Sequence, residues 1–225
     1  MPVSSNKLLS RLSRADLRLL EPHLEAVELP VRTQLEARNK RVRHVYFLDK
    51  GMASVVANGQ HEIEVGIIGR EGMSGLSVVL DADRNNRAVH ETFMQIGGSG
   101  QRLSADPLRE AMAASGTMQQ VFLRYAHAFL IQATQTALAN GRSKIEERLA
   151  RWLLLAADRM DGNALALTHE FLAMMLGVRR AGVTIALQGL ERVGLIAYRR
   201  GVITILDREA LEKSSNGTYL PLADN

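Results

Sequence analysis

A segment in the last third of the chain has an excess of positively charged side chains. Residues 165–206 hold five arginines against two glutamates, an excess of three positive charges in a chain whose net charge is +4. The arginines are Arg179, Arg180, Arg192, Arg199 and Arg200. A guanidinium group can bind a phosphate, or donate two hydrogen bonds to the O6 and N7 atoms of a guanine. Nucleic-acid binding is therefore the first chemistry to consider.

Two short helices joined by a tight turn are predicted to carry these arginines. Apolar spacing favours helices over residues 169–176 and 179–193, with Thr168 as N-cap of the first and Gly177 in the turn. Residues 195–206 then form a hairpin. Two helices, a glycine turn and a hairpin in this order predict a winged helix-turn-helix.

The positions of the polar side chains fit DNA contact. Arg179 and Arg180 open the second helix, whose first turn meets base edges in the major groove. Thr168 and His169 open the first helix, where free backbone N–H groups can hold a phosphate.

The hairpin tip adds two further cations. Arg199 and Arg200 lie where a wing would touch the DNA backbone. Paired arginines can also form an ordinary solvated face, and a helix-turn-helix can be a protein-interaction module. The alternative function is therefore a ligand-sensing regulatory module whose C-terminal domain contacts a protein partner.

The first hundred residues have a strand pattern instead. Short apolar runs alternate with turn signals, which favours an antiparallel sandwich or barrel. The expected strands cover residues 26–29, 42–48, 52–57, 62–68, 78–80, 89–96 and 101–103. Helices are expected over 6–20, 108–114, 117–139, 143–160 and 207–213, with a frayed end from residue 214. The fold class is therefore α+β.

The long helix over residues 117–139 has a heptad seam that predicts a dimer interface. Its members recur at intervals of four and three residues. They are Met118, Phe122, Tyr125, Phe129, Gln132 and Thr136. The alternative is that this seam packs only on the barrel of its own chain.

Composition excludes several classes of protein. The chain has no cysteine, which removes disulfides, thiolate metal sites, cysteine-ligated clusters and thiol nucleophiles. It shows no P-loop, no metal triad and no nucleophile paired with a base, so it is not expected to be an enzyme or to need a cofactor or a metal. No apolar run is long enough to cross a membrane and no secretory leader is visible, so a cytoplasmic location is expected.

Two stretches resemble the Crp/Fnr family of bacterial transcription regulators. They are Leu-Thr-His-Glu-Phe-Leu-Ala-Met-Met-Leu-Gly-Val-Arg-Arg at 167–180 and Leu-Glu-Arg-Val-Gly-Leu-Ile at 190–196. The resemblance implies a cyclic-nucleotide-binding-like jelly roll over 1–115, a dimerisation helix over 116–141 and a winged helix-turn-helix over 142–225. It also implies a homodimer on a near-palindromic DNA operator, with RNA polymerase as a further partner.

By position, the resemblance implies that Arg180 reads a guanine. Arg179, Ala181 and Thr184 share the same end of that helix and are grouped with it as base-reading residues. The best-known family members have a glutamate and a second arginine where this chain has Ala181 and Ile185. Their operator sequence is therefore not expected here.

The resemblance also places an effector pocket in the barrel, around Gly72, Gly75, Leu76 and Arg87. Glycine amides and an arginine can bind a phosphate, and a carboxylate would bind the ribose. Leu76 stands where the ribose-binding glutamate is expected, and the surroundings of Arg87 match the family only loosely. Tight binding of cyclic AMP is therefore not expected, and the glycines can simply permit a corner of the jelly roll.

Overall fold

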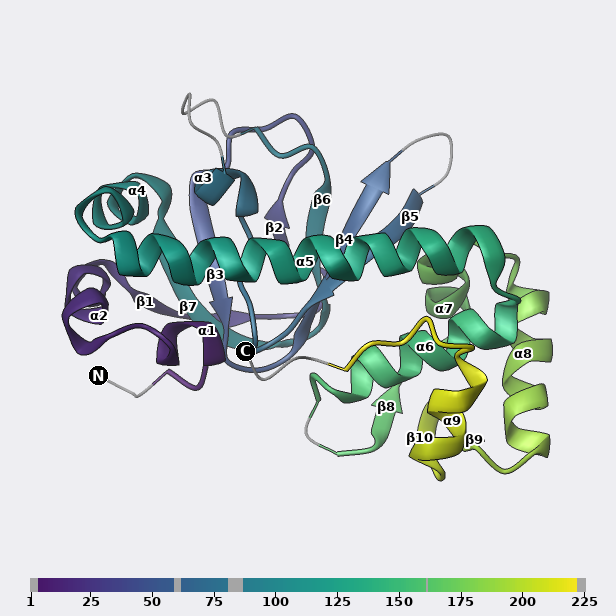
Figure 1. Cartoon of the computed structure of the whole chain (residues 1–225). Coiled ribbons are helices and arrows are strands. Elements are labelled where there is room, and N and C mark those ends of the chain that lie inside the picture. The colour runs from purple at the N-terminus through teal and green to yellow at the C-terminus, as the bar shows by residue number, and fades with distance from the viewer. Residues whose placement is uncertain (1–3, 59–61, 81–86, 161, 222–225) are drawn as a thin grey trace. The chain divides into compact units, whose positions relative to one another are not determined.

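The structure is a computed structural model that describes residues 4–58, 62–80, 87–160 and 162–221. Its contacts divide the chain into two units (Figure 1). The first consists of Met1–Ala57 and Ile67–Ile131, and the second of Asn58–Gly66 and Gln132–Asn225.

Two antiparallel sheets organise the N-terminal part of the chain. One has the order β1-β7-β3, formed by Glu25–Leu29, Gly98–Ser104 and His44–Leu48. The other has the order β2-β6-β4-β5, formed by Gln34–Glu36, Glu91–Ile96, Met52–Asn58 and Glu62–Ile68. The expected β-rich region is confirmed, while the short strand β2 was not predicted because its three residues carry almost no periodic signal.

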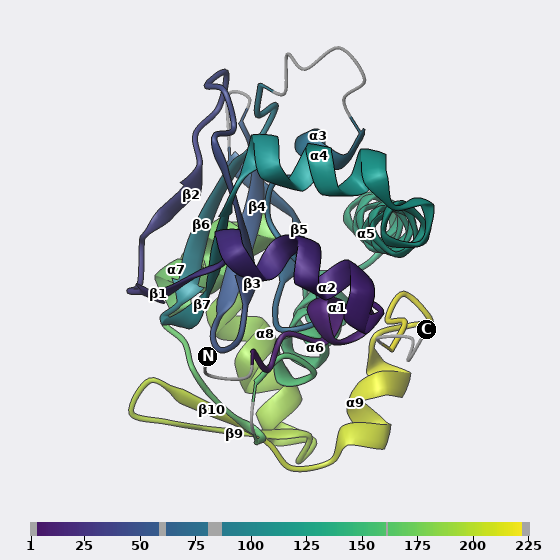
Figure 2. The same cartoon turned by 90° about the vertical axis from the view of Figure 1, so that its left-hand side faces the viewer.

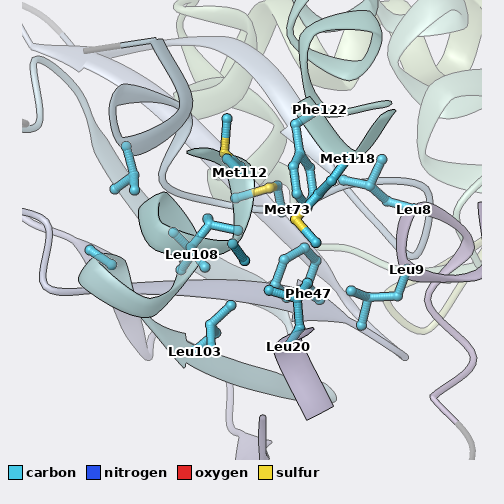
Figure 3. Packing of buried hydrophobic residues seen from close by; sticks show 14 of the residues in the cluster. Leu8, Leu9, Leu20, Phe47, Met73, Leu103, Leu108, Met112, Met118 and Phe122 are labelled. Carbon is cyan, nitrogen blue, oxygen red and sulfur yellow. The ribbon is translucent and has the colours of Figure 1, made fainter. Parts of the chain in front are cut away.

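Small helices close the core of the first unit. They are α1 (Lys7–Ser10), α2 (Arg14–Leu20), the 3-10 turn η1 (Glu21–His23), α3 (Leu76–Leu80) and α4 (Ala105–Ala114). The single helix predicted over 6–20 is two helices, because the Ser13 hydroxyl accepts a hydrogen bond from the Asp16 N–H and starts a new one. Figure 3 shows Leu8 and Leu20 packed in one cluster with Phe47 and Phe122.

The prediction of a strand over 78–80 is wrong. These residues belong to helix α3, which begins directly after Gly75, and the Val78 N–H donates to the Gly75 carbonyl at 2.9 Å. Leu76 and Val79 pack against the same core as the buried Val78. A run this short cannot be assigned from periodicity alone, because an apolar segment of five residues fits a strand or a helix.

The long helix α5 runs from Gly116 to Arg142 and directly follows α4 (Figure 1). The predicted last residue, Ala139, is three residues too early. The Ser143 N–H still donates to the Ala139 carbonyl, so the helical hydrogen bonding continues through the glycine. A glycine in the last turn of a helix costs little, because few backbone bonds depend on it there.

The second unit contains the predicted winged helix-turn-helix. Its helices are α6 (Ile145–Ala157), α7 (His169–Leu176), α8 (Arg180–Arg192) and α9 (Arg208–Ser214). Its sheet has the order β8-β10-β9, formed by Ala164–Ala166, Val202–Ile205 and Ile196–Arg199. Helix α6 begins after Lys144, whose N–H donates to Glu147, and not after Ser143 as the sequence suggested.

Buried polar contacts join distant segments of this unit around α6. The Trp152 indole donates to Glu64 Oε1 at 2.6 Å. The neighbouring Arg151 donates to the carbonyls of Thr218 and Gln132 and to the Thr136 hydroxyl. Burial lowers the pKa of Arg151 to about 10, so its guanidinium stays charged at neutral pH.

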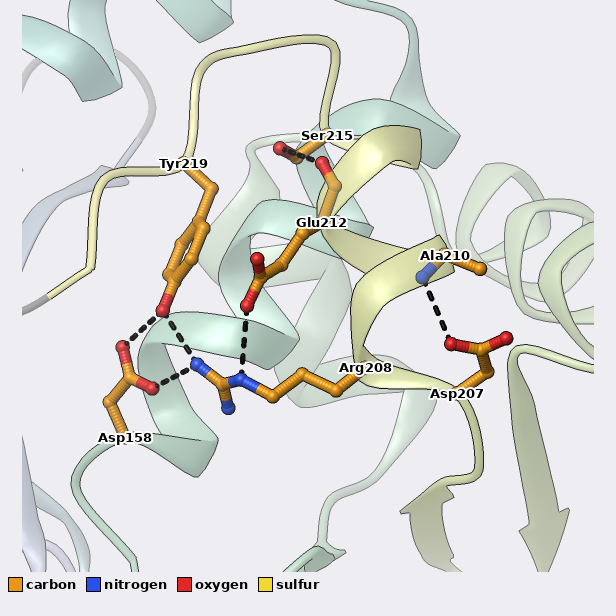
Figure 4. Close-up of polar contacts among 7 residues, drawn as sticks. All are labelled: Asp158, Asp207, Arg208, Ala210, Glu212, Ser215 and Tyr219. Atoms are coloured by element: carbon orange, nitrogen blue, oxygen red, sulfur yellow. Dashed lines mark hydrogen bonds and ion pairs between the residues drawn. The ribbon is translucent and has the colours of Figure 1, made fainter.

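Residues 214–219 are held against α6, which corrects the expectation of fraying for this part; the expectation for residues 222–225 lies outside the described residues. Figure 4 shows the Tyr219 hydroxyl donating to Asp158 Oδ2 at 2.8 Å, while Arg208 bonds to the same carboxylate and to Tyr219. Burial, followed by the Asp158 hydrogen bond, raises the pKa of Tyr219 above its usual range. The polar composition of this tail concealed two anchors, Thr218 and Tyr219, that are each less than 8% exposed.

Candidate nucleic-acid interface

The turn between α7 and α8 forms as its residue types require. The Thr168 hydroxyl accepts a hydrogen bond from the Phe171 N–H at 3.2 Å and caps α7. Gly177 ends α7 in the left-handed conformation, with φ of +60°. Helix α8 then buries Val183 and Leu187, which leaves its opposite face outward.

Arg180 is the first residue of α8 and is well exposed. Its Nε lies 2.9 Å from Glu170 Oε1 on α7, and both side chains are about two-thirds exposed. An exposed pair of this kind contributes at most about 1 kcal/mol, so the guanidinium can exchange Glu170 for another acceptor at little cost. Arg179 and Ala181, on either side, are also exposed.

His169 links three elements of the domain. Its Nδ1 lies 2.9 Å from the Thr184 hydroxyl on α8, and its ring lies 4.9 Å from that of Tyr198 on β9. The Thr184 hydroxyl also donates to the Arg180 carbonyl. His169 and Thr184 were predicted to touch DNA separately, but the structure places them against each other, where they hold α7, α8 and the wing together.

The wing turns at Arg200-Gly201, and the hairpin projects from its unit in Figure 2. Both turn residues have positive φ, +52° and +81°, as a two-residue type I′ turn needs. Arginine is an uncommon residue at such a position because its side chain makes positive φ unfavourable. Arg200 is exposed there, while Arg199 Nη1 lies 2.6 Å from Glu191 Oε1.

The glycines of the expected effector pocket are already in contact with other side chains of the first unit. A Cβ on Gly72 would lie 2.4 Å from the Tyr125 ring, whose hydroxyl donates to the Met73 carbonyl. Gly75 has φ of +84°, and its N–H donates to Glu36 Oε1 at 2.9 Å. The Thr92 hydroxyl donates to the same oxygen at 3.0 Å. The Glu36 side chain therefore already accepts the hydrogen bond from the Gly75 amide, which a bound phosphate would need.

Burial raises the pKa of Glu36 above its usual range, against the lowering effect of its bonds from Gly75 and Thr92. Glu36 was not among the predicted site residues, because its side chain reaches Gly75 across 39 positions of the chain. No local motif could have signalled that contact.

The other two pocket candidates do not converge on this amide. Leu76 packs against the hydrophobic core. Arg87 is exposed and donates to the Asn39 carbonyl at 3.0 Å. A nearby cavity of about 190 Å³ is lined by residues 34–37, 40–44 and 46, and it is smaller than the roughly 300–1,000 Å³ of ordinary ligand pockets. Within the described ranges, no three histidine or carboxylate side chains are grouped to hold a metal ion.

The predicted dimer seam on α5 belongs largely to the core of its own chain. Met118 and Phe122 are fully buried and Tyr125 is 8% exposed, while Phe129 and Gln132 are half-buried. Met118, Phe122 and Tyr125 are buried within their own chain and cannot contact a partner. The prediction that they form the dimer interface is therefore corrected. Their apolar character reflects packing on the barrel, the alternative that the sequence had left open.

The opposite face of α5 carries a second apolar pattern with the same period. Leu123 and Leu130 are seven residues apart, as are Ile131 and Leu138, and all four are between 41% and 61% exposed. His127 and Thr134 lie between them and are exposed. The seven-residue spacing was visible in the sequence, but nothing there showed which of the two seams faces outward.

Comparison with known proteins agrees with this architecture. Residues 147–214 match the family model of the Crp-like helix-turn-helix domain. No curated protein matches the chain by sequence. Among the described residues, no helix combines the length and the apolar character needed to cross a membrane.

Solved structures resemble the chain over most of its length. A transcriptional regulator of the Crp/Fnr family from Eubacterium rectale has a TM-score of 0.72 at 20% identity, covering 93% of this chain and 98% of the other. FixK2 from Bradyrhizobium japonicum has a TM-score of 0.72 at 16% identity, covering 89% and 99%. The c-di-GMP responsive regulator CLP from Xanthomonas campestris has a TM-score of 0.69 at 16% identity, covering 86% and 99%.

These comparisons confirm the resemblance and the α+β fold that the sequence indicated. Regulators of this type act by binding DNA and not by catalysis. Residues 147–214 therefore match a Crp-like helix-turn-helix domain, and the chain shares over most of its length the fold of the Crp/Fnr-type regulators to which it is similar.

Proposed function

We propose that the protein is a homodimer that binds a near-palindromic DNA operator sequence-specifically, without control by tight cyclic-AMP binding. The observation that carries this proposal is the exposed position of Arg180 at the start of α8, beside a helix face that the core leaves free. Two copies of this end of α8 would read two half-sites.

The proposed dimer interface is the outward face of α5. Four large apolar side chains in two seven-residue repeats are costly to leave in water and suit a parallel helix pair. His127 and Thr134 supply polar positions that can fix the register of the pair.

The absence of tight cyclic-AMP control is supported by Glu36 and Leu76. A cyclic phosphate at the Gly75 amide would have to displace the Glu36 side chain, which already accepts the hydrogen bond of that amide. Leu76 provides no acceptor for a ribose hydroxyl. The c-di-GMP response named for CLP is not assigned to this chain.

A random-DNA binding selection with the purified full chain and no added small molecule tests the proposal. Enrichment of a near-palindrome supports a DNA-reading dimer that needs no effector. If a folded, dimeric sample enriches no sequence, sequence-specific binding without an effector is refuted. Retention of a protein partner with an affinity independent of salt would instead favour the protein-binding alternative, because contacts to phosphates weaken steeply as salt rises.

A further inference from the structure

The face of α8 opposite its buried side carries an unusual apolar residue. Ala181, Ile185, Gln188 and Arg192 follow one another at intervals of four, three and four residues and are all exposed. Ile185 is 64% exposed. These four residues form the reading face of α8.

The reading face begins one residue after Arg180 and points away from the packing of its own unit. Val183, Ala186, Leu187 and Leu190 fill the opposite side of the helix and are each at most 4% exposed. The core of the unit is thus complete without Ile185. Its branched side chain remains available for another molecule.

A side chain without donors or acceptors can distinguish only one feature of the base edges in the major groove. That feature is the C5-methyl group of thymine, which apolar side chains contact directly. Ala181 adds a second methyl group one turn before Ile185. Neither residue can donate a hydrogen bond to guanine or accept one from cytosine.

We infer that Ile185 is a specificity-determining residue that selects thymine by contact with its methyl group. This inference rests on the proposed DNA-reading function and deepens it. Ile185 lies five residues after Arg180, about 7.5 Å along the helix axis, so the two side chains would reach neighbouring but different base pairs. Each half-site should therefore contain a thymine within a few base pairs of the guanine read by Arg180.

Replacing thymidine by deoxyuridine, one position at a time, tests this directly because it removes only the methyl group. The probe is the duplex enriched by the selection, and affinity is measured by fluorescence anisotropy. For the natural chain, uracil at the critical position should weaken binding about fourfold in one half-site and about sixteenfold in both, the effect of one buried methyl group. For Ile185→Ala, the same change should cost less than twofold.

Val193→Ala is the matched control. Val193 is 63% exposed and lies just after the last residue of α8, outside the reading face. It should retain the full uracil effect. Because Ile185 is exposed, alanine at this position leaves the core intact, and circular dichroism of each variant verifies the fold.

Three outcomes overturn the inference. They are that the natural chain binds every uracil-substituted duplex as tightly as the original, that Ile185→Ala keeps the full uracil effect, or that the half-site contains no thymine near the guanine. In each case binding to the enriched duplex persists, so the proposed function stands. If no duplex is enriched at all, the proposed function fails and this inference fails with it.

Discussion

The glycine cassette of the barrel and the start of helix α8 differ in what their polar groups already contact. In the barrel, the Gly75 amide is paired with Glu36, and the space beside Gly72 is filled by Tyr125. At the start of α8, Arg179 and Arg180 are exposed, and Arg180 has one exposed ion pair. In the glycine cassette the hydrogen-bond donor is already paired within the chain, while at the start of α8 the arginine donors are exposed to solvent.

This difference separates two uses of similar chemistry. A half-buried carboxylate that accepts two hydrogen bonds is difficult to displace, because both donors would lose their partner. An exposed guanidinium–carboxylate pair is inexpensive to exchange. The anion-binding capacity of the winged helix is therefore free for DNA, and that of the barrel is used for its own structure.

The largest effect is expected when the outward face of α5 receives a charge. Leu130→Arg should abolish the dimer and weaken binding to the full operator by at least roughly a hundredfold, because the second half-site no longer adds to the first. Sedimentation velocity measures the dimer. Ala128→Arg places the same charge at another exposed position of α5 and should leave the dimer intact; an unchanged dimer in Leu130→Arg would contradict the proposed interface.

The next effect concerns the reading end of α8. Arg180→Ala should weaken binding by about 1–3 kcal/mol, or roughly 5–150-fold, and relax the preference at one base pair per half-site. Binding to duplexes that carry each of the four bases at that position provides the measurement. Glu170→Ala removes only the exposed ion-pair partner and should change affinity less than about fivefold. A preference that survives Arg180→Ala would refute the base contact.

The wing should contribute a smaller, sequence-independent effect. Arg199→Ala and Arg200→Ala are each expected to weaken binding severalfold on all duplexes and to reduce the slope of log affinity against log salt by about 0.9 for each lost phosphate contact. Arg18→Ala, on the exposed surface of α2, serves as the control and should leave the slope unchanged. An effect confined to one base pair would argue against a backbone role.

In the barrel, Glu36 makes stability depend on pH. Because its folded pKa is raised, its contribution to stability is complete below the unfolded value near 4.5 and is lost as pH rises through the folded value. Glu36→Gln keeps an acceptor for Gly75 and Thr92 and should remove this loss. Urea unfolding of both proteins from pH 4 to pH 8, followed by circular dichroism, should give curves that diverge as pH rises; parallel curves would show that Glu36 does not titrate in this way.

Cyclic AMP is expected to have no effect on the thermal stability of the chain. Cyclic AMP at 1 mM should not raise the melting temperature of the full chain, because Glu36 and Leu76 disfavour it at the cassette. A ligand present at a hundredfold excess over its Kd would add about 2.7 kcal/mol of stability, which calorimetry detects readily. A clear rise would contradict the proposal and show that Glu36 can be displaced.

The sequence by itself determined the winged helix-turn-helix. Thr168, Gly177 and the apolar spacing of α7 and α8 act within a few residues of one another, so the local pattern contains the information that forms them. Because these signals are local, they also predicted that Arg180 lies at the start of α8. Its contact with a guanine stays a prediction, because the free chain shows its position and not its DNA partner.

Only the tertiary structure decided which face of α5 is buried and what occupies the Gly75 amide. Two seven-residue patterns run along α5, and packing against Phe47 selects the one that contains Phe122. Glu36 reaches Gly75 from a strand 39 residues earlier. The sheet pairings that bring such residues together depend on contacts between distant segments, and periodicity within one segment does not contain that information.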